Sequence, residues 1–140
     1  MGAWPGVAEA AAALSIALSA YGLPRSAARV LALLLLSGVP LTSKEVAKLT
    51  GYSKSTISAA LRMLESMKVI RRMRQGRSAA FAASISLSQF LLKVQVDAVE
   101  GIVRRVREIK GRADPSLKRR LESIEGELAS LSSRLRGVVL

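Results

Sequence analysis

The side chains best suited to binding chemistry lie in the middle of this 140-residue sequence, and they are hydroxyls, lysines and arginines. Hydroxyl and ammonium groups donate hydrogen bonds to phosphate oxygens, and a guanidinium can donate two in parallel to paired acceptors. Residues 41–84 hold nine basic and two acidic side chains, so this segment carries +7 of the net charge of +12. Charge gathered on one segment favours a polyanionic partner over general solubility, which is the plainer explanation.

Two stretches hold the candidate contacts. The first mixes short polar side chains with basic ones, and short side chains let a helix enter the major groove of duplex DNA closely. The second places arginines around a glycine. The candidate DNA contacts are Thr42, Ser43, Lys44, Ser53, Lys54, Ser55, Thr56, Ser58, Ala59 and Arg62 in the first stretch, and Arg72, Arg74, Gln75 and Arg77 in the second.

The first stretch is predicted to form a helix, a tight turn and a second helix. Thr42 and Glu45 have the spacing of a capping box, which starts a helix that ends at residue 49 or 50. Gly51 suits the turn because glycine tolerates positive φ. Ser53 is a typical N-cap, here for a longer helix that reaches about Met67.

The second of these helices has one apolar and one polar face. Ile57, Leu61 and Leu64 recur at helical spacing, so we expect them to be buried. The opposite face presents Arg62, the best candidate for a bidentate contact with guanine or for a phosphate clamp. Ser53 is expected to act mainly as a cap. For the other polar-face residues taken as a set, the alternative to DNA contact is a face that is merely solvated. That set is Lys54, Ser55, Ser58, Ala59 and Arg62, with Thr56 at its edge.

The second stretch is predicted to be a β-hairpin, with strands at Val69–Arg74 and Ser78–Ala83 and a tight turn at Gln75-Gly76. Arg74 and Arg77 bracket that turn, and such a basic hairpin, or wing, lies along the DNA backbone or reaches into a narrow minor groove. Arg71 and Arg72 point to opposite faces of their strand, so at most one faces DNA squarely. A charged edge strand that resists aggregation is the alternative.

Helices are expected on both sides of the segment formed by residues 41–84. They are predicted at Val7–Tyr21, apolar nearly all round and therefore buried, at Pro24–Ser37, at Ile85–Lys110 and from Pro115 onward. The fold class is mainly α with a small β-hairpin wing. We expect residues 1–22 to be an N-terminal helix at a dimer interface, residues 23–84 the winged helix-turn-helix domain, and residues 85–140 long dimerisation helices.

The last helix carries a heptad seam. Apolar residues recur at alternating spacings of four and three, which is typical of a coiled coil. Pairing of two copies through the terminal helices is favoured, and folding back onto Ile85–Lys110 within one chain is the alternative. The candidate dimerisation residues are Leu117, Leu121, Ile124, Leu128, Leu131 and Leu135.

Several function classes are disfavoured by composition. The sequence has no cysteine and no histidine, so thiolate and imidazole metal sites, thiol redox chemistry and a histidine base are excluded. No metal or cofactor is expected, and we expect no enzyme because no nucleophile–base pair is visible. The N-terminus lacks a basic leader and Val30–Leu36 is too short to span a bilayer, so we expect a cytoplasmic protein with no membrane partner.

The stretch from Leu41 to about Ala83, and above all the phrase SKSTISAALRMLESMKVIRR, resembles the winged-helix domain of the MarR superfamily, especially its GbsR-like branch. The resemblance implies a homodimer in which N- and C-terminal helices build the interface. It also implies a DNA-binding repressor that releases DNA on binding a small-molecule effector. The alanine-rich second wing strand departs from that family and leaves the effector open.

Three functions fit these observations. The first is a homodimeric, sequence-specific regulator of transcription that binds double-stranded DNA. The second is a sequence-neutral architectural DNA-binding protein, favoured by the small polar helix face and the high charge. The third is a winged-helix adaptor that binds another protein through the heptad seam.

Overall fold

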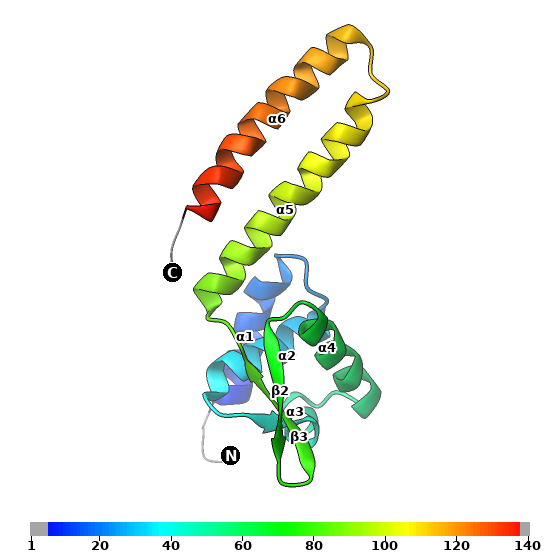
Figure 1. Cartoon of the computed structure of the whole chain (residues 1–140). Coiled ribbons are helices and arrows are strands. Elements are labelled where there is room, and N and C mark those ends of the chain that lie inside the picture. Colours follow the sequence, from blue (N-terminus) through cyan, green and yellow to red (C-terminus); the bar gives the residue numbers. More distant parts are fainter. Residues whose placement is uncertain (1–5, 138–140) are drawn as a thin grey trace. The chain divides into compact units, whose positions relative to one another are not determined.

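The computed structural model describes residues 6–137 as helices joined to a small antiparallel sheet (Figure 1). The chain divides into two compact units, one ending at Ser86 and the other beginning at Leu87. The first unit contains α1 (Val7–Ser19), α2 (Arg25–Ser37), β1 (Leu41–Thr42), α3 (Ser43–Thr50), α4 (Lys54–Ser66), β2 (Ile70–Gln75) and β3 (Ser78–Ala83). The second contains α5 (Leu87–Lys110) and α6 (Pro115–Arg136).

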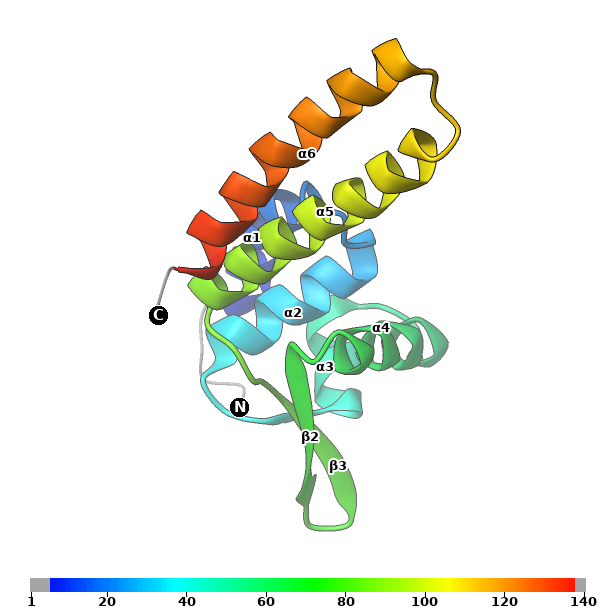
Figure 2. The same ribbon diagram turned by 45° about the horizontal axis from the view of Figure 1, so that its top comes forward.

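Helix α2 is the centre of the first unit. Val30 and Leu31 are fully buried, because α2 packs on α1, on α4 and on β3. Figure 2 shows α2 lying between α1 and the pair formed by α3 and α4. Pro24 precedes α2 as its N-cap instead of occupying the first turn, and Gly38 closes the helix with a φ of 70°.

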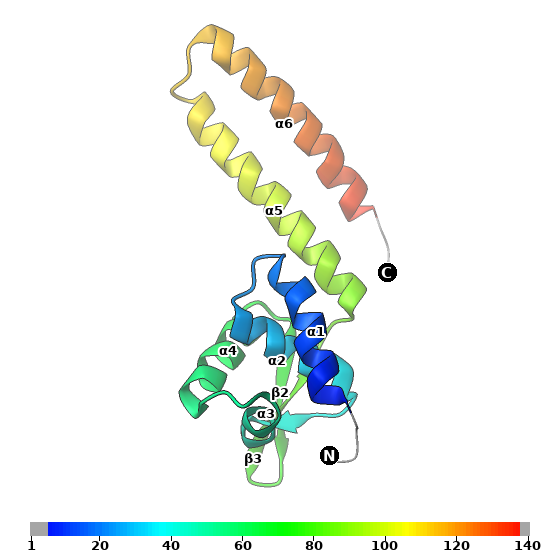
Figure 3. The same cartoon turned by 180° about the vertical axis from the view of Figure 1, so that it is seen from behind.

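Helix α1 is less buried than its composition predicts. Within the described chain it buries one face, through Ala11, Ser15 and Leu18, whereas Ile16 on another face is 71% exposed. Figure 3 shows α1 crossing α2, on which it packs. The prediction of burial on all sides is therefore wrong for the described chain, because apolar composition alone cannot state how many neighbours a helix has.

The sheet of the first unit has three strands in the order β1-β3-β2, all antiparallel. The sequence predicts the hairpin but not β1, because two residues give no periodic pattern. Leu41 pairs with Phe81, and Phe81 also pairs with Arg72. The turn differs by one residue from its predicted position: Gln75 still pairs with Ser78, and Gly76, at a φ of 63°, begins the two-residue turn. A glycine with positive φ at the first turn position suits a type II′ hairpin.

The second unit is an antiparallel helical hairpin. Asp114 caps α6 by accepting a hydrogen bond of 2.8 Å from the backbone N–H of Leu117, and Pro115 is the first residue of the helix. The residues of the predicted heptad seam divide into buried and exposed positions in this hairpin. Leu121 is buried and Leu128 and Leu135 are half-buried, whereas Leu117, Ile124 and Leu131 are exposed. Residues 1–5 of the predicted N-terminal segment and residues 138–140 of the predicted C-terminal segment lie outside the described residues.

Candidate nucleic-acid interface

Helices α3 and α4 are joined by the predicted tight turn, and local sequence determines its geometry. Thr42 and Glu45 form the complete capping box, with the Thr42 side chain accepting from the Glu45 N–H and the Glu45 carboxylate accepting from the Thr42 N–H at 3.0 Å. Gly51 ends α3 at a φ of 78°, where a side chain would be strained. The Arg29 guanidinium lies 5.8 Å from the centre of the Tyr52 ring, so the turn also contacts α2.

The apolar face of α4 is buried as predicted. Ile57, Leu61 and Leu64 are at most 3% exposed, together with Ala60. Since one face is fixed in the core, the opposite face is available to a partner, and Lys54, Ser55, Ala59 and Arg62 are exposed on it. Thr56 and Ser58 are half-buried at its margins.

A hollow of about 460 Å³ lies between α3 and α4, and it brings two lysines together. Lys44 comes from the first turn of α3 and Lys54 from the first turn of α4. Ser43, the half-buried Ala47 and the buried Ile57 also line this hollow. Two ammonium groups beside the first turns of two helices form an electropositive surface suited to a phosphate group.

The hydroxyls at the start of α4 hydrogen-bond to one another. Ser53 accepts a hydrogen bond of 3.2 Å from the Thr56 N–H and donates one of 2.9 Å to the Thr56 hydroxyl. The Ser55 hydroxyl lies 3.2 Å from that of Ser53. Ser53 is therefore a helix cap, as the sequence predicts.

The wing projects from the rest of the first unit as a two-stranded ribbon (Figure 2). Arg77 is exposed in the turn, and Gln75 is exposed at the end of β2. Arg74 lies further from the tip than predicted, pairs with Ala79 across the ribbon, and donates from Nε to the Gly76 carbonyl at 3.4 Å. Arg72, Arg74 and Arg77 line one hollow of about 460 Å³ on the wing.

Arg72 differs from the other candidate arginines because it contacts two side chains. Its guanidinium donates to both carboxylate oxygens of Glu65 on α4, at 3.3 Å and 3.0 Å, and lies 5.1 Å from the centre of the Phe81 ring. The hydrogen bond with Glu65 and its negative charge raise the pKa of Arg72 above its ordinary value. No sequence pattern indicates the contact of Arg72 with Glu65, because a helix residue and a strand residue on either side of a link share no common periodicity.

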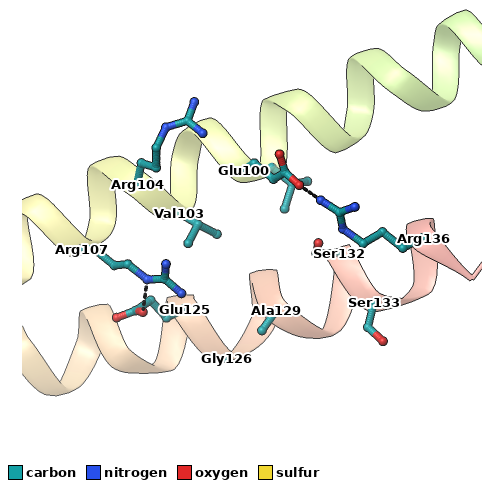
Figure 4. A pocket seen from close by; sticks show the side chains of 11 residues that line it. Glu100, Val103, Arg104, Arg107, Glu125, Gly126, Ala129, Ser132, Ser133 and Arg136 are labelled. Carbon is teal, nitrogen blue, oxygen red and sulfur yellow. Dashed lines mark hydrogen bonds and ion pairs between the residues drawn. The ribbon is translucent and has the colours of Figure 1, made fainter.

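A larger hollow, of about 810 Å³, lies between α5 and α6 (Figure 4). Its charges are paired across the hairpin: Arg107 with Glu125 and Arg136 with Glu100. Lys110 Nζ lies 2.5 Å from the second Glu125 oxygen, and this contact, followed by that of Arg107, lowers the pKa of Glu125 although partial burial opposes the shift. Arg104 points away from α6 (Figure 4). These pairs join the two helices.

The described part of the chain holds neither a membrane-spanning helix nor a metal-ligating cluster. No helix among residues 6–137 is both long and apolar enough to cross a bilayer. In the same residues, no three carboxylates lie close enough together to ligate a metal ion.

Comparison with known proteins relates the central segment to one family. Residues 21–79 match the model of the MarR family. A solved structure described as a transcriptional regulator is 22% identical, with a TM-score of 0.75 and coverage of 94% of both chains. The transcriptional regulator Tm0710 from Thermotoga maritima is 17% identical at a TM-score of 0.47, covering 95% of this chain and 90% of its own. MepR, a transcription regulator of the Staphylococcus aureus multidrug efflux pump MepA, is 20% identical at a TM-score of 0.45, and the match covers 88% of this chain and 90% of MepR. No curated protein matches the sequence.

These findings agree with the geometry of the first unit. The matched residues begin just after α1, contain the whole helix-turn-helix and end within β3. The chain is thus mainly helical with a small antiparallel wing, has the fold of a solved transcriptional regulator, and matches the MarR family over residues 21–79.

Proposed function

We propose that this chain is a MarR-type regulator of transcription that binds double-stranded DNA in a sequence-specific manner. The observation that carries the proposal is that α4 has one buried face and one exposed face. Ile57 and Leu61 fix one face in the core, while Lys54 and Arg62 are exposed on the other. A helix held in this way by a preceding helix and turn is the element that enters the major groove in helix-turn-helix proteins.

Each element then has a separate role. Arg62, Ala59 and Ser58 face base edges, with Arg62 able to donate to guanine and the Ala59 methyl able to contact thymine. Lys44 and Lys54, which line one hollow together with Ser43, hold a backbone phosphate. The hydroxyls of Thr42, Ser55 and Thr56 are further proposed phosphate contacts. Arg74, Gln75 and Arg77 of the wing follow the backbone or the minor groove.

The proposal includes a homodimer. Six large apolar side chains of α5 and α6 are 37–50% exposed: Leu87, Ile102, Ile109, Leu117, Ile124 and Leu131. Ile102 and Ile109 are seven residues apart, as are Leu117, Ile124 and Leu131, so each set forms a line along its helix. These two lines, and the exposed Ile16 of α1, offer apolar surface to a second copy. The α4 helices of two copies, held about 34 Å apart, would enter successive major grooves of the duplex.

Finer features rest on the resemblance of residues 41–83 to MarR-type regulators. They are the GbsR-like branch, a repressor role, release by a small-molecule effector and a cytoplasmic location. The proposal assigns no reaction to the chain, because its exposed groups are donors and cations suited to holding phosphates.

A binding assay tests DNA recognition directly. Wild-type protein is titrated into a fluorescein-labelled duplex of mixed sequence at several salt concentrations, and the variant R62A/R74A/R77A is titrated in parallel. We expect Kd to rise steeply with salt, and the absolute log–log slope to fall by about 0.9 for each phosphate that the variant no longer neutralises. R119A/R120A/R134A, which removes three exposed arginines of α6, is the matched control and should keep the wild-type slope.

The outcomes separate the three functions. A slope that is identical in both triple variants would contradict DNA contact by α4 and the wing. Equal Kd values of the wild type on several unrelated duplexes, titrated in the same way, would indicate the architectural function. Absence of DNA binding by the wild type, with capture of a protein partner through α6, would indicate the adaptor.

A further inference from the structure

We infer that Arg72 is a positioning residue that sets the wing relative to α4, and not a phosphate contact. The inference rests on the proposed function, because it names the group that aligns the two DNA-facing elements. It separates Arg72 from Arg74 and Arg77, which line the same hollow of the wing.

The contacts of Arg72 reach both elements. Its Nε and one terminal nitrogen donate to the two oxygens of Glu65, which lies in the last turn of α4. A guanidinium that donates in parallel to both oxygens of a carboxylate is fixed in direction as well as in distance. Arg72 is thereby oriented toward α4, although its side chain remains 55% exposed.

The second contact fixes Arg72 to the sheet. Arg72 and Phe81 are directly opposite in the β2–β3 ladder, and the guanidinium lies over the Phe81 ring. Phe81 is 3% exposed and pairs on its other side with Leu41 of β1, which is fully buried. The contacts of Arg72 with Glu65 and Phe81 therefore connect the C-terminal end of α4 to a buried residue of the wing.

The link between α4 and β2 explains why such a tie matters. After α4, the Lys68 N–H donates to the Glu65 carbonyl at 2.9 Å and the Val69 N–H to the Leu64 carbonyl at 3.2 Å. This is a Schellman turn, and it leaves Lys68 at a φ of 62°. The turn fixes where the chain leaves α4. Beyond it the β2–β3 ribbon extends away from the helices (Figure 2). The contact between Arg72 and Glu65 therefore limits how far the ribbon can move relative to α4.

The two roles of Arg72 make opposite predictions for Glu65. If Arg72 positions the wing, Glu65→Gln should weaken binding even though it removes a negative charge near DNA. If Arg72 binds phosphate, the same change frees Arg72 and should strengthen binding. The sign of one change therefore distinguishes them.

The experiment compares E65Q, R72A and E65Q/R72A with wild type on the fluorescein-labelled mixed-sequence duplex. Arg71 is the matched control, since it is the neighbouring exposed strand arginine. We expect both single variants to raise Kd by about three-fold and the double variant to raise it no further, with an unchanged salt slope. Stronger binding by E65Q, or a slope reduced by about 0.9 in R72A, would overturn the inference. Unchanged Kd in E65Q would overturn it as well.

A second measurement works without DNA, so failure of the proposed function and failure of this inference can be told apart. The sequence has no cysteine, so A59C/Q75C places spin labels on α4 and near the wing tip only. We expect E65Q to broaden the label–label distance distribution, and R71A to leave it as narrow as in the parent. An unchanged distribution in E65Q would contradict the inference, whether or not the protein binds DNA.

Discussion

Leu121 and Ile124 lie three residues apart on α6 and have opposite environments. Leu121 is 7% exposed, whereas Ile124 is 40% exposed. Leu121, Leu128 and Leu135 follow one another at intervals of seven and are the more buried, so half of the heptad seam is used within the hairpin. The other half, Leu117, Ile124 and Leu131, is exposed in a single chain.

Replacing Ile124 by Gln should weaken association of two copies. The proposed interface would lose an apolar side chain and would have to bury an amide, which is unfavourable without a partner. Sedimentation equilibrium should show a lower average mass than wild type at equal concentration, with unchanged helical circular dichroism. An average mass equal to that of wild type would place the interface elsewhere.

Replacing Leu121 by Ala should act on folding instead. Truncation of a buried leucine leaves a cavity, and we expect the free energy of unfolding to fall by about 2 kcal/mol, near the lower end of such changes. Urea unfolding should be compared at equal protein concentration, because association also contributes to apparent stability. Equal loss of stability in the Ile124 and Leu121 variants would contradict the division of the seam.

Local signals predict much of this fold. The capping box of Thr42 and Glu45, the turn at Gly51 and the Ser53 cap each need only neighbouring residues, and all three are present. Features that depend on distant partners are not predicted. Strand β1 exists because Leu41 pairs with Phe81, forty residues further along, and Arg72 contacts Glu65 because the link folds β2 back on α4. The predicted DNA contacts themselves stay predictions.

Replacing Lys68 by Gly should stabilise the protein. Lys68 has a φ of 62°, in the left-handed region that costs a non-glycine residue roughly 1 kcal/mol or more. Part of that gain is offset because glycine is more flexible when unfolded, so we expect a net increase of about 0.5 kcal/mol in thermal or urea unfolding. Gly51→Ala is the matched change in the reverse direction, at a φ of 78°, and should destabilise by about 1 kcal/mol. Destabilisation by Lys68→Gly would show that the turn depends on the lysine side chain.

The ion pairs of Glu125 should make the α5–α6 hairpin sensitive to acid. Contact with Lys110, and then with Arg107, holds the pKa of Glu125 below its usual range. A lowered folded-state pKa contributes stability at pH above the unfolded value, about 4.3, and that contribution disappears as the pH falls through the folded value. Glu125→Gln should therefore lower the melting temperature at neutral pH, and the difference from wild type should shrink as the pH falls into the acid range below the unfolded value.

Glu122 supplies the control for this pH dependence. It is an exposed carboxylate on the same helix, and Glu122→Gln should change the melting temperature little at either pH. A melting temperature difference between wild type and Glu125→Gln that persists unchanged into acid would show that the contribution of Glu125 is not ionic.

Selection of bound fragments from genomic DNA tests the central claim most directly. Wild-type protein and R62A are each incubated with sheared genomic DNA at physiological salt, and the retained fragments are sequenced. We predict that wild type enriches discrete sites with two half-sites about one helical turn apart, and that R62A loses preference at one position in each half-site. Uniform recovery of the genome by the wild type would contradict sequence-specific recognition by α4.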